Sequence, residues 1–339
     1  MKEEIVWIDV LKGLGIIFVV YGHVYDNYLR DFFFMFHMPL FFFLGGYLFR
    51  PSCNTQEYMK KKAIHLLIPY VAFMLVLYWP AMYSAVTSRD APLEATLDVF
   101  TDMAMGGRAL VGWMAVFWFV TCFFMTQQVI NWLIKRCTER VMIAIMIVSM
   151  MLSYANQFAD RSFWLPWNLN VVVAAAPFFY AGYWVKVKEL NWASAKVWGP
   201  ATIVALAAMV ALSLMPRMQF DMKYALYGLP VIGFVIPIAI TLVLMRLTRL
   251  MDDIAYVTPA LKMLGKASMV IMFLHYPILS IWQHYFHHQA DVACVIASIA
   301  LPLCVYRICQ YSCITRIFFI GSVNDIYRLR SSSEGTYSR

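Results

Sequence analysis

The chain has 339 residues, of which 62% are hydrophobic and only 14% are charged, with a mean hydropathy of +0.67. A soluble domain is nearer half apolar and a quarter charged, so this composition excludes a soluble globular protein. The apolar runs are continuous and about 20 residues long rather than alternating, which also excludes a membrane β-barrel. The net charge of +8 does not indicate nucleic-acid binding, because Lys and Arg fall in short clusters between the apolar runs. We expect an all-α, polytopic bundle of transmembrane helices.

About ten apolar runs are long enough to cross a lipid bilayer as helices. We expect spans at residues 8–28, 32–49, 64–86, 111–134, 141–157, 167–185, 197–215, 224–245, 265–283 and 292–311. Lys and Arg are concentrated in every second loop, so the positive-inside rule predicts that both termini are cytoplasmic. We divide the chain into a transmembrane domain, 1–315, and a polar cytoplasmic tail, 316–339, whose end is expected to be disordered.

The first expected span, DVLKGLGIIFVVYGH at 9–23, carries a cation and an imidazole, Lys12 and His23. Their separation is about three helical turns plus roughly 20°, so both side chains lie on one face, about 16 Å apart along the axis. Ionisable groups this deep in a bilayer usually face the bundle interior or a wet cavity. The alternative is that Lys12 reaches the interface and His23 is hydrogen-bonded within a packed core.

The second expected span, FFFMFHMPLFFFLGGYLF, carries another imidazole, His37. Histidines on adjacent antiparallel spans can face one cavity, although a hydrogen-bonded packing role is an equal alternative for His37. Asp26 follows His23 by three residues and is a candidate to orient its imidazole, as a carboxylate does in a catalytic triad. A solvated interfacial position is the alternative for Asp26. Asp9 stands three residues before Lys12, close enough to pair with it.

Three later stretches carry further polar or aromatic candidates. The sequence YMKKKAIHLLIPY places Lys61, Lys62 and His65 at the expected cytosolic mouth of the third span. VFWFVTCFF contains Trp118, and LGKASMVIMFLHYPIL contains Ser268 and His275 on one helical face. HYFHH at 284–288 resembles a metal cluster, but its place among aromatics at a span end favours an interfacial loop. No metal site is expected.

The order and spacing of these motifs resemble the acyltransferase-3 family of bacterial integral-membrane O-acyltransferases. That family includes polysaccharide and O-antigen acetylases and fucose 4-O-acetylase-like proteins. The resemblance runs from Trp7 to about Pro277 and begins with Lys12-x10-His23. It implies transfer of an acyl group, most often acetyl from acetyl-CoA, to a sugar hydroxyl of a surface polysaccharide or lipid-linked glycan. It also implies a bacterial inner-membrane location and polysaccharide-assembly proteins as partners.

The resemblance assigns roles to residues of this chain. His23 takes the catalytic role, and the position of His37 on the adjacent span makes it a second candidate. Because Lys commonly binds phosphate, Lys12, Lys61, Lys62 and His65 are expected to bind the donor's phosphates. An ordinary topology signal is the equal alternative for the lysine cluster. Lys62-x-x-His65 stands where the family often has Arg-x-x-Arg, so the second position lacks a fixed cation. The residues expected at the substrate are Asp26, Trp118, Ser268 and His275. Helix–helix hydrogen bonding is an equal alternative for Ser268 and His275, and an interfacial aromatic belt is the alternative for Trp118.

Two other function classes fit parts of the pattern. A transporter of a lipid-linked sugar or small solute would also have many spans with buried charges. It would be expected to show repeat symmetry, which we do not find in the sequence. A non-catalytic assembly subunit would bind a glycan precursor without turnover and would not depend on the His23 imidazole.

Overall fold

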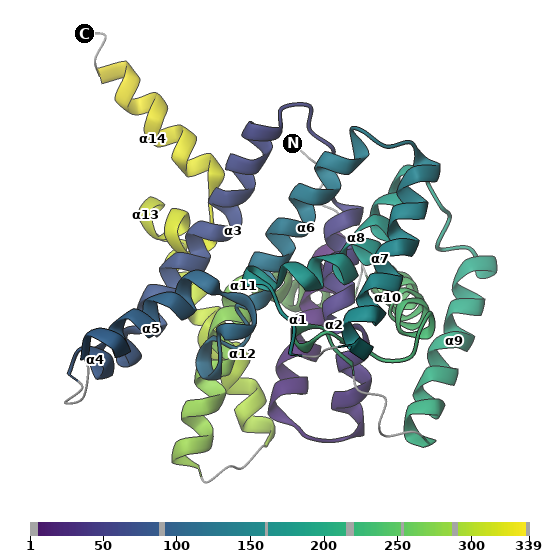
Figure 1. Cartoon of the computed structure of the whole chain (residues 1–339), viewed down its shortest axis with the longest axis horizontal. Coiled ribbons are helices and arrows are strands. Elements are labelled where there is room, and N and C mark those ends of the chain that lie inside the picture. The colour runs from purple at the N-terminus through teal and green to yellow at the C-terminus, as the bar shows by residue number, and fades with distance from the viewer. Residues whose placement is uncertain are drawn as a thin grey trace.

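The computed structural model describes residues 6–87, 92–159, 162–214, 220–251, 254–286 and 291–336, and most of these residues are helical (Figure 1). The longer helices are α1 (Val6–Val24), α2 (Tyr28–Tyr47), α3 (Thr55–Leu77), α5 (Pro92–Met105), α6 (Trp118–Ile134), α7 (Glu139–Ala159), α8 (Leu169–Val187), α9 (Ala195–Leu214), α10 (Ile232–Leu250), α11 (Val257–Tyr285), α12 (Val292–Cys309) and α14 (Val323–Thr336). The shorter ones are α4 (Trp79–Val86), η1 (Gly107–Ala109), η2 (Gly112–Met114), η3 (Pro166–Asn168), η4 (Met222–Tyr224), α13 (Cys313–Thr315) and the π-helical turn η5 (Arg316–Ile320). The expected all-α class is confirmed.

Each of the ten expected spans overlaps a helix of the structure. Within the described ranges, six helical segments are long and apolar enough to cross a membrane: α1, 112–134, α7, α10, α11 and α12. The pair α3 and α4, bent by 50°, would make a seventh. The chain is therefore a multi-pass membrane protein, while the count of ten crossings and the cytoplasmic termini stay predictions.

Helix α1 packs against α11 at two glycines. A Cβ added at Gly13 would overlap the carbonyl oxygen of Leu261, and one added at Gly265 would overlap the carbonyl oxygen of Asp9. Only glycine lets the two backbones come this close, as at small-residue interfaces in membranes generally. These two contacts fix how α1 and α11 are aligned along their length.

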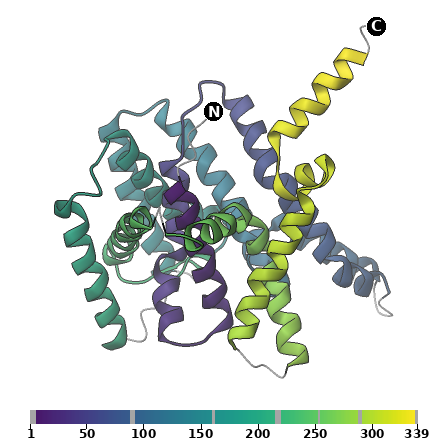
Figure 2. The ribbon, with the colours of Figure 1, turned by 180° about the vertical axis from the view of Figure 1, so that it is seen from behind.

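Helix α2 packs against α8 in the same manner. Gly46 lies against the carbonyl of Phe179, and Gly182 lies against the carbonyl of Phe43. Aromatic side chains fill the space around this crossing, and much of the buried apolar core surrounds α2. Two views show α9 at one flank of the molecule and α4 and α5 at the other (Figures 1 and 2).

The eighth expected span, 224–245, begins later than expected, at Ile232. The residues before it form a small hairpin of β1 (Phe220–Asp221) and β2 (Leu226–Tyr227), which pair antiparallel around η4. Gln157 of α7 holds the hairpin, since its Oε1 accepts from Tyr227 N at 2.6 Å and its Nε2 donates to the Gly228 carbonyl at 3.1 Å. This connection therefore packs against the helices instead of forming an open loop.

The first part of the expected polar tail, 316–339, is folded and packs against the helical body. Arg316 binds Asp325 through two hydrogen bonds of 2.7 and 2.9 Å, and this pairing holds the pKa of Asp325 well below its usual range. Gly321, at φ +71°, packs against α3. The chain continues as α14 to Thr336, beyond the start of the stretch expected to be disordered, and α14 projects from the body in both views (Figures 1 and 2).

Candidate active site

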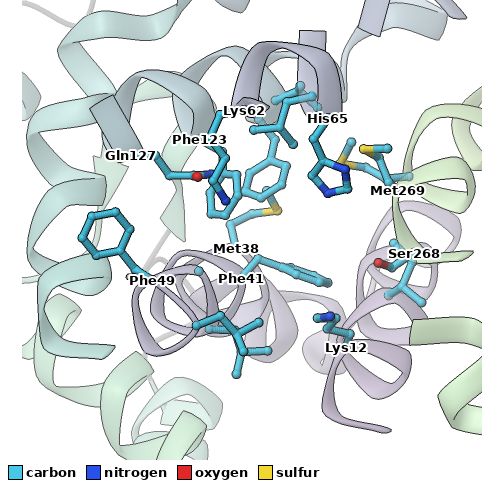
Figure 3. Close-up of a pocket in the computed structure, with 18 of the residues that line it drawn as sticks. Lys12, Met38, Phe41, Phe49, Lys62, His65, Phe123, Gln127, Ser268 and Met269 are labelled. Carbon is cyan, nitrogen blue, oxygen red and sulfur yellow. The ribbon is translucent and has the colours of Figure 1, made fainter. Parts of the chain in front are cut away.

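A cavity of about 2160 Å³ lies between the helices, lined from α1, α2, α3, α6, α8, α11, the hairpin and the start of α14. Ordinary small-molecule sites measure roughly 300–1,000 Å³, so this one has room for a long donor and a second substrate. Figure 3 shows a part of its lining in which α3 contributes Lys62 and His65, across from Lys12 and Ser268.

One end of the cavity, here called the basic end, lies where α1, α3 and α11 begin and where α2 and α8 end. It is lined by Arg50, Lys61, Lys62, Lys186 and Lys266. Aromatic contacts join these helix ends: Trp7 of α1 lies 5.4 Å from Tyr47 of α2, between ring centroids, and the Lys186 ammonium lies 5.4 Å from the Tyr47 ring. Cations from distant parts of the chain thus meet at one mouth.

Two of the expected donor-binding lysines already have carboxylate partners. Lys12 donates to Asp9 at 3.0 Å, as its spacing in the sequence predicted, and Lys61 pairs with Glu57 at 2.6 Å. Both lysines still line the cavity. A phosphate approaching either ammonium would share it with a carboxylate.

Lys62 and His65 lie differently. The half-buried Lys62 places its ammonium 5.5 Å from the ring of Tyr58, a cation–π contact. His65 contacts the C-terminal segment, since its Nδ1 lies 3.1 Å from the carbonyl oxygen of Gly321. In contrast to Lys12 and Lys61, Lys62 is shown with an aromatic ring and not a carboxylate beside its ammonium. His65 connects the basic end of the cavity with the segment between η5 and α14.

The other end of the cavity, here called the histidine end, is formed around His23. The His23 ring lies 5.2 Å from that of His275, 5.3 Å from Tyr276 and 5.6 Å from Phe34, measured between centroids. The same Phe34 ring lies 4.8 Å from the ring of His37, again between centroids. His23 and His37 both line the cavity, and the Phe34 ring contacts both of them.

Backbone carbonyls fix the tautomers of two of these imidazoles. Nδ1 of His37 lies 2.8 Å from the Phe33 carbonyl oxygen, and Nδ1 of His275 lies 3.0 Å from that of Ile271. A carbonyl oxygen only accepts, so in both neutral rings Nδ1 carries the proton and Nε2 is left as the base. The same helical i to i−4 contact thus presents an acceptor nitrogen from α2 and another from α11.

Asp26 does not reach the histidine end. Its carboxylate accepts from Arg30 at 2.9 Å, and its side chain is 93% exposed. Arg30 itself lines the cavity and lies over the Phe34 ring at 4.9 Å. The structure therefore does not place Asp26 where it would orient His23, because its carboxylate forms an ion pair with Arg30.

The remaining expected substrate residues lie in different layers. Trp118, at the start of α6, and Ser268, on α11, line the cavity. His275 is fully buried and stands behind His23 rather than in the lining. The structure therefore places His275 next to His23 and outside the cavity lining, and its contact with substrate stays a prediction.

Two cavity residues of the hairpin escaped the sequence analysis as site candidates. Asp221 accepts from the backbone N–H of Lys223 at 3.0 Å, and the buried Lys223 ammonium donates to the Leu110 carbonyl at 2.6 Å. Burial raises the pKa of Asp221 to about 6 and lowers the pKa of Lys223 to about 8. Lys223 and Arg30 both lie within electrostatic range of the His23 ring.

The local sequence contained a weak signal for this pair. DMKY at 221–224 puts opposite charges two residues apart in a connection too short to form a domain of its own. A loop between spans is ordinarily solvated, so the sequence alone gave no reason to bury it. Within the described residues, no group of three or more His, Cys, Asp or Glu is arranged to hold a metal, while His287 and His288 of the HYFHH stretch lie outside those residues.

Comparisons with known proteins identify the family of the chain. The chain is 28% identical over 164 residues to the nodulation protein NolL of Sinorhizobium fredii (strain NBRC 101917 / NGR234), a match covering 42% of this chain and 42% of that protein. The chain thus matches less than half the length of this relative, and no solved structure matches it. Residues 5–307 match the acyltransferase domain of the acyltransferase-3 family. The chain therefore belongs to this family.

Proposed function

We propose that the protein is an O-acetyltransferase of the bacterial inner membrane that moves an acetyl group from acetyl-CoA to a sugar hydroxyl of a surface polysaccharide or lipid-linked glycan. The observation that carries the proposal is the single cavity that connects the basic end to the histidine end. Anionic donor and neutral acceptor would then enter one site from opposite ends. Both termini and the basic end would face the cytoplasm.

The donor would lie along α1. Lys62, with Lys12 and Lys61, offers ammonium groups to the phosphates of coenzyme A, for which Lys is a common partner. Lys12 and His23 are separated by about 16 Å along the helix axis. An extended pantetheine arm would span that distance and bring the thioester to the imidazole.

The transfer itself needs one base. His23 would accept the proton of the sugar hydroxyl as the hydroxyl oxygen bonds to the acyl carbon, and collapse of the tetrahedral adduct would break the C–S bond. The coenzyme A thiolate would leave with the proton that His23 took up, so the enzyme returns to its starting state. A positioned general base contributes typically 10²–10⁴-fold, or about 3–5 kcal/mol of barrier.

The tetrahedral adduct carries a negative oxygen, and the histidine end holds cations that could stabilise it. Lys223 is buried there, within electrostatic range of His23. Preorganised charge in a water-poor site is often the largest contribution to acyl transfer. Tyr276 and Tyr224 offer aromatic walls beside the same end for a sugar ring.

The test uses the purified protein in lipid nanodiscs, [1-14C]acetyl-CoA and the glycolipid fraction of the source bacterium. Wild type should transfer label to glycolipid, and His23→Gln should lose roughly 10²–10⁴-fold of the rate. Phe286→Leu, an exposed substitution near the end of α11, serves as the control. Equal rates for His23→Gln and wild type would refute the catalytic role of His23.

The rival transporter would use the same cavity without chemistry. One observation supports this alternative: the cavity has charged groups at both ends, as a path for a polar solute would. Proteoliposomes that move labelled glycolipid across the bilayer without consuming acetyl-CoA would support the transporter and contradict acyl transfer.

Polysaccharide-assembly proteins are the expected partners of the acyltransferase.

A further inference from the structure

We infer that His275 is a positioning residue for His23, whose ring N–H it accepts through Nε2. This contact would select the His23 tautomer that leaves the other ring nitrogen free to take the proton of the acceptor hydroxyl. The catalytic meaning of the inference rests on the proposed function. The hydrogen bond would form in the folded protein without substrate, so it can be tested without turnover.

His275 is built to accept a hydrogen bond. Its side chain is fully buried, and its Nδ1 is committed to the Ile271 carbonyl, so the neutral ring has a lone pair at Nε2. Within the part of the chain that the structure describes, this Nε2 has no hydrogen-bond partner. A buried acceptor without a partner is costly, and His23 is the imidazole beside it.

The distance between the rings suits the bond. The centroids of His23 and His275 are 5.2 Å apart, with the ring planes 39° to each other. Two imidazoles joined by an N–H···N bond of about 2.9 Å have centroids about 5.2 Å apart, since each nitrogen lies about 1.15 Å from its ring centre. Turning His23 about its Cβ–Cγ bond redirects its nitrogens with almost no movement of the centroid.

The backbone holds the two rings in register. Gly13 and Gly265 bring α1 and α11 into close contact at the basic end. From that contact, equal lengths of helix lead to His23 on α1 and His275 on α11, so the two helices run parallel. The glycine contact thus sets the alignment of the two backbones that carry these rings.

The choice of variants separates the acceptor from the packing role of His275. In His275→Asn, the side-chain amide can still donate to the Ile271 carbonyl but does not extend to the Nε2 position. In His275→Gln, the longer side chain places an oxygen near that position. His284→Leu, an exposed histidine near the end of the same helix, is the control. Detergent gel filtration establishes that each variant is folded.

The first readout is the tautomer of His23. Protein carrying 15N-labelled histidine is reconstituted in lipid, and the His23 signals are assigned by their loss in His23→Phe. Solid-state NMR should show one neutral tautomer for His23 in wild type, His275→Gln and His284→Leu, and a mixture in His275→Asn. A mixture in wild type, or no change in His275→Asn, would overturn the inference.

The second readout is the acetyl-transfer rate with [1-14C]acetyl-CoA and the glycolipid fraction. His275→Asn should lower kcat roughly 10–10²-fold with little change in KM for acetyl-CoA, and His275→Gln should recover most of the loss. The loss is smaller than the ~10⁴-fold of a triad carboxylate because a neutral imidazole carries no charge. An unchanged kcat in His275→Asn refutes the inference. A wild type without transfer contradicts the proposed function, and the tautomer result then still decides the inference.

Discussion

Gly321 and His65 contact each other twice, although they come from opposite parts of the chain. The Gly321 carbonyl lies 3.1 Å from Nδ1 of His65, and the Gly321 Cα faces the His65 backbone so closely that an added Cβ would overlap its carbonyl oxygen. Gly321 also has φ +71°, which favours glycine. Residues that follow it, Asn324 and Tyr327, line the mouth of the cavity.

Gly321→Ala should therefore loosen the C-terminal segment. The left-handed backbone and the overlap together should cost roughly 1–3 kcal/mol. Limited trypsin digestion should then cut after Arg316 faster than in wild type, because its pairing with Asp325 depends on this turn. Gly199→Ala, at a helical glycine with open space around it, should leave the digestion unchanged. Equal cleavage in Gly321→Ala and wild type would contradict the role given to this contact.

Lys62→Gln should raise KM for acetyl-CoA with a smaller effect on kcat. Charge-assisted hydrogen bonds contribute about 1.5–3 kcal/mol, which corresponds to roughly a 10–100-fold loss of affinity. Lys60→Gln is the matched control, since Lys60 is exposed and Lys62 lines the cavity. Initial rates against acetyl-CoA concentration provide the measurement. The prediction is wrong if the two variants raise KM equally.

Asp221 should make stability depend on pH in mildly acidic solution. Its folded-state pKa, about 6, is raised above the ordinary value of 3.8, so the folded protein binds more protons between these values. Stability therefore falls as pH rises from about 4 through 6. Asp221→Asn removes this ionisation cost and should stabilise the protein at pH 7 by ~2–3 kcal/mol relative to its effect at pH 4.

Thermal unfolding of both proteins in detergent at pH 4, 5, 6 and 7 gives the comparison, because the difference between them cancels the other titrating groups. Asp221→Asn preserves an oxygen that can accept from the Lys223 backbone N–H. A difference in Tm that is constant across this range would show that Asp221 ionises as freely in the folded protein as in the unfolded one.

Gly13→Ala should disturb both stability and turnover. The added methyl group meets the Leu261 carbonyl, so α1 must shift against α11 at a cost of roughly 1–3 kcal/mol. The shift would also separate His23 from His275. Fluorescence-detected gel filtration after heating, with kcat measured on the surviving protein, tests both effects, and Gly199→Ala again serves as control. Unchanged kcat at reduced Tm would show that the register of α1 and α11 matters only for stability.

The sequence predicted the helices well because hydropathy acts on each segment separately. A run such as residues 8–28 must form a helix in lipid, where every backbone polar group needs a partner. The pairing of Lys12 with Asp9, and the common cavity of His23 and His37, also followed from helical spacing and the order of spans. These features depend on one helix or on two neighbours in the chain.

The features missed by the sequence analysis depend on packing between distant segments. Asp26 lies three residues after His23 and four before Arg30, and only the structure shows that it pairs with Arg30. Lys223 is buried because Gln157 of another helix holds its hairpin in place. His275 lies behind His23 because glycines on two helices permit a close approach. The local pattern of hydrophobic and polar residues predicts none of these three contacts.

The parallel packing of α1 and α11 also bears on how the protein is made. A ribosome delivers α1 to the membrane first, and α11 emerges only after most of the chain has been synthesised. Until then the Gly13 face of α1 lacks the partner that α11 provides. The two halves of the histidine end therefore meet late in biogenesis, and a nascent chain that stops before α11 is complete contains His23 and the α2 residues beside it but lacks His275 and Tyr276.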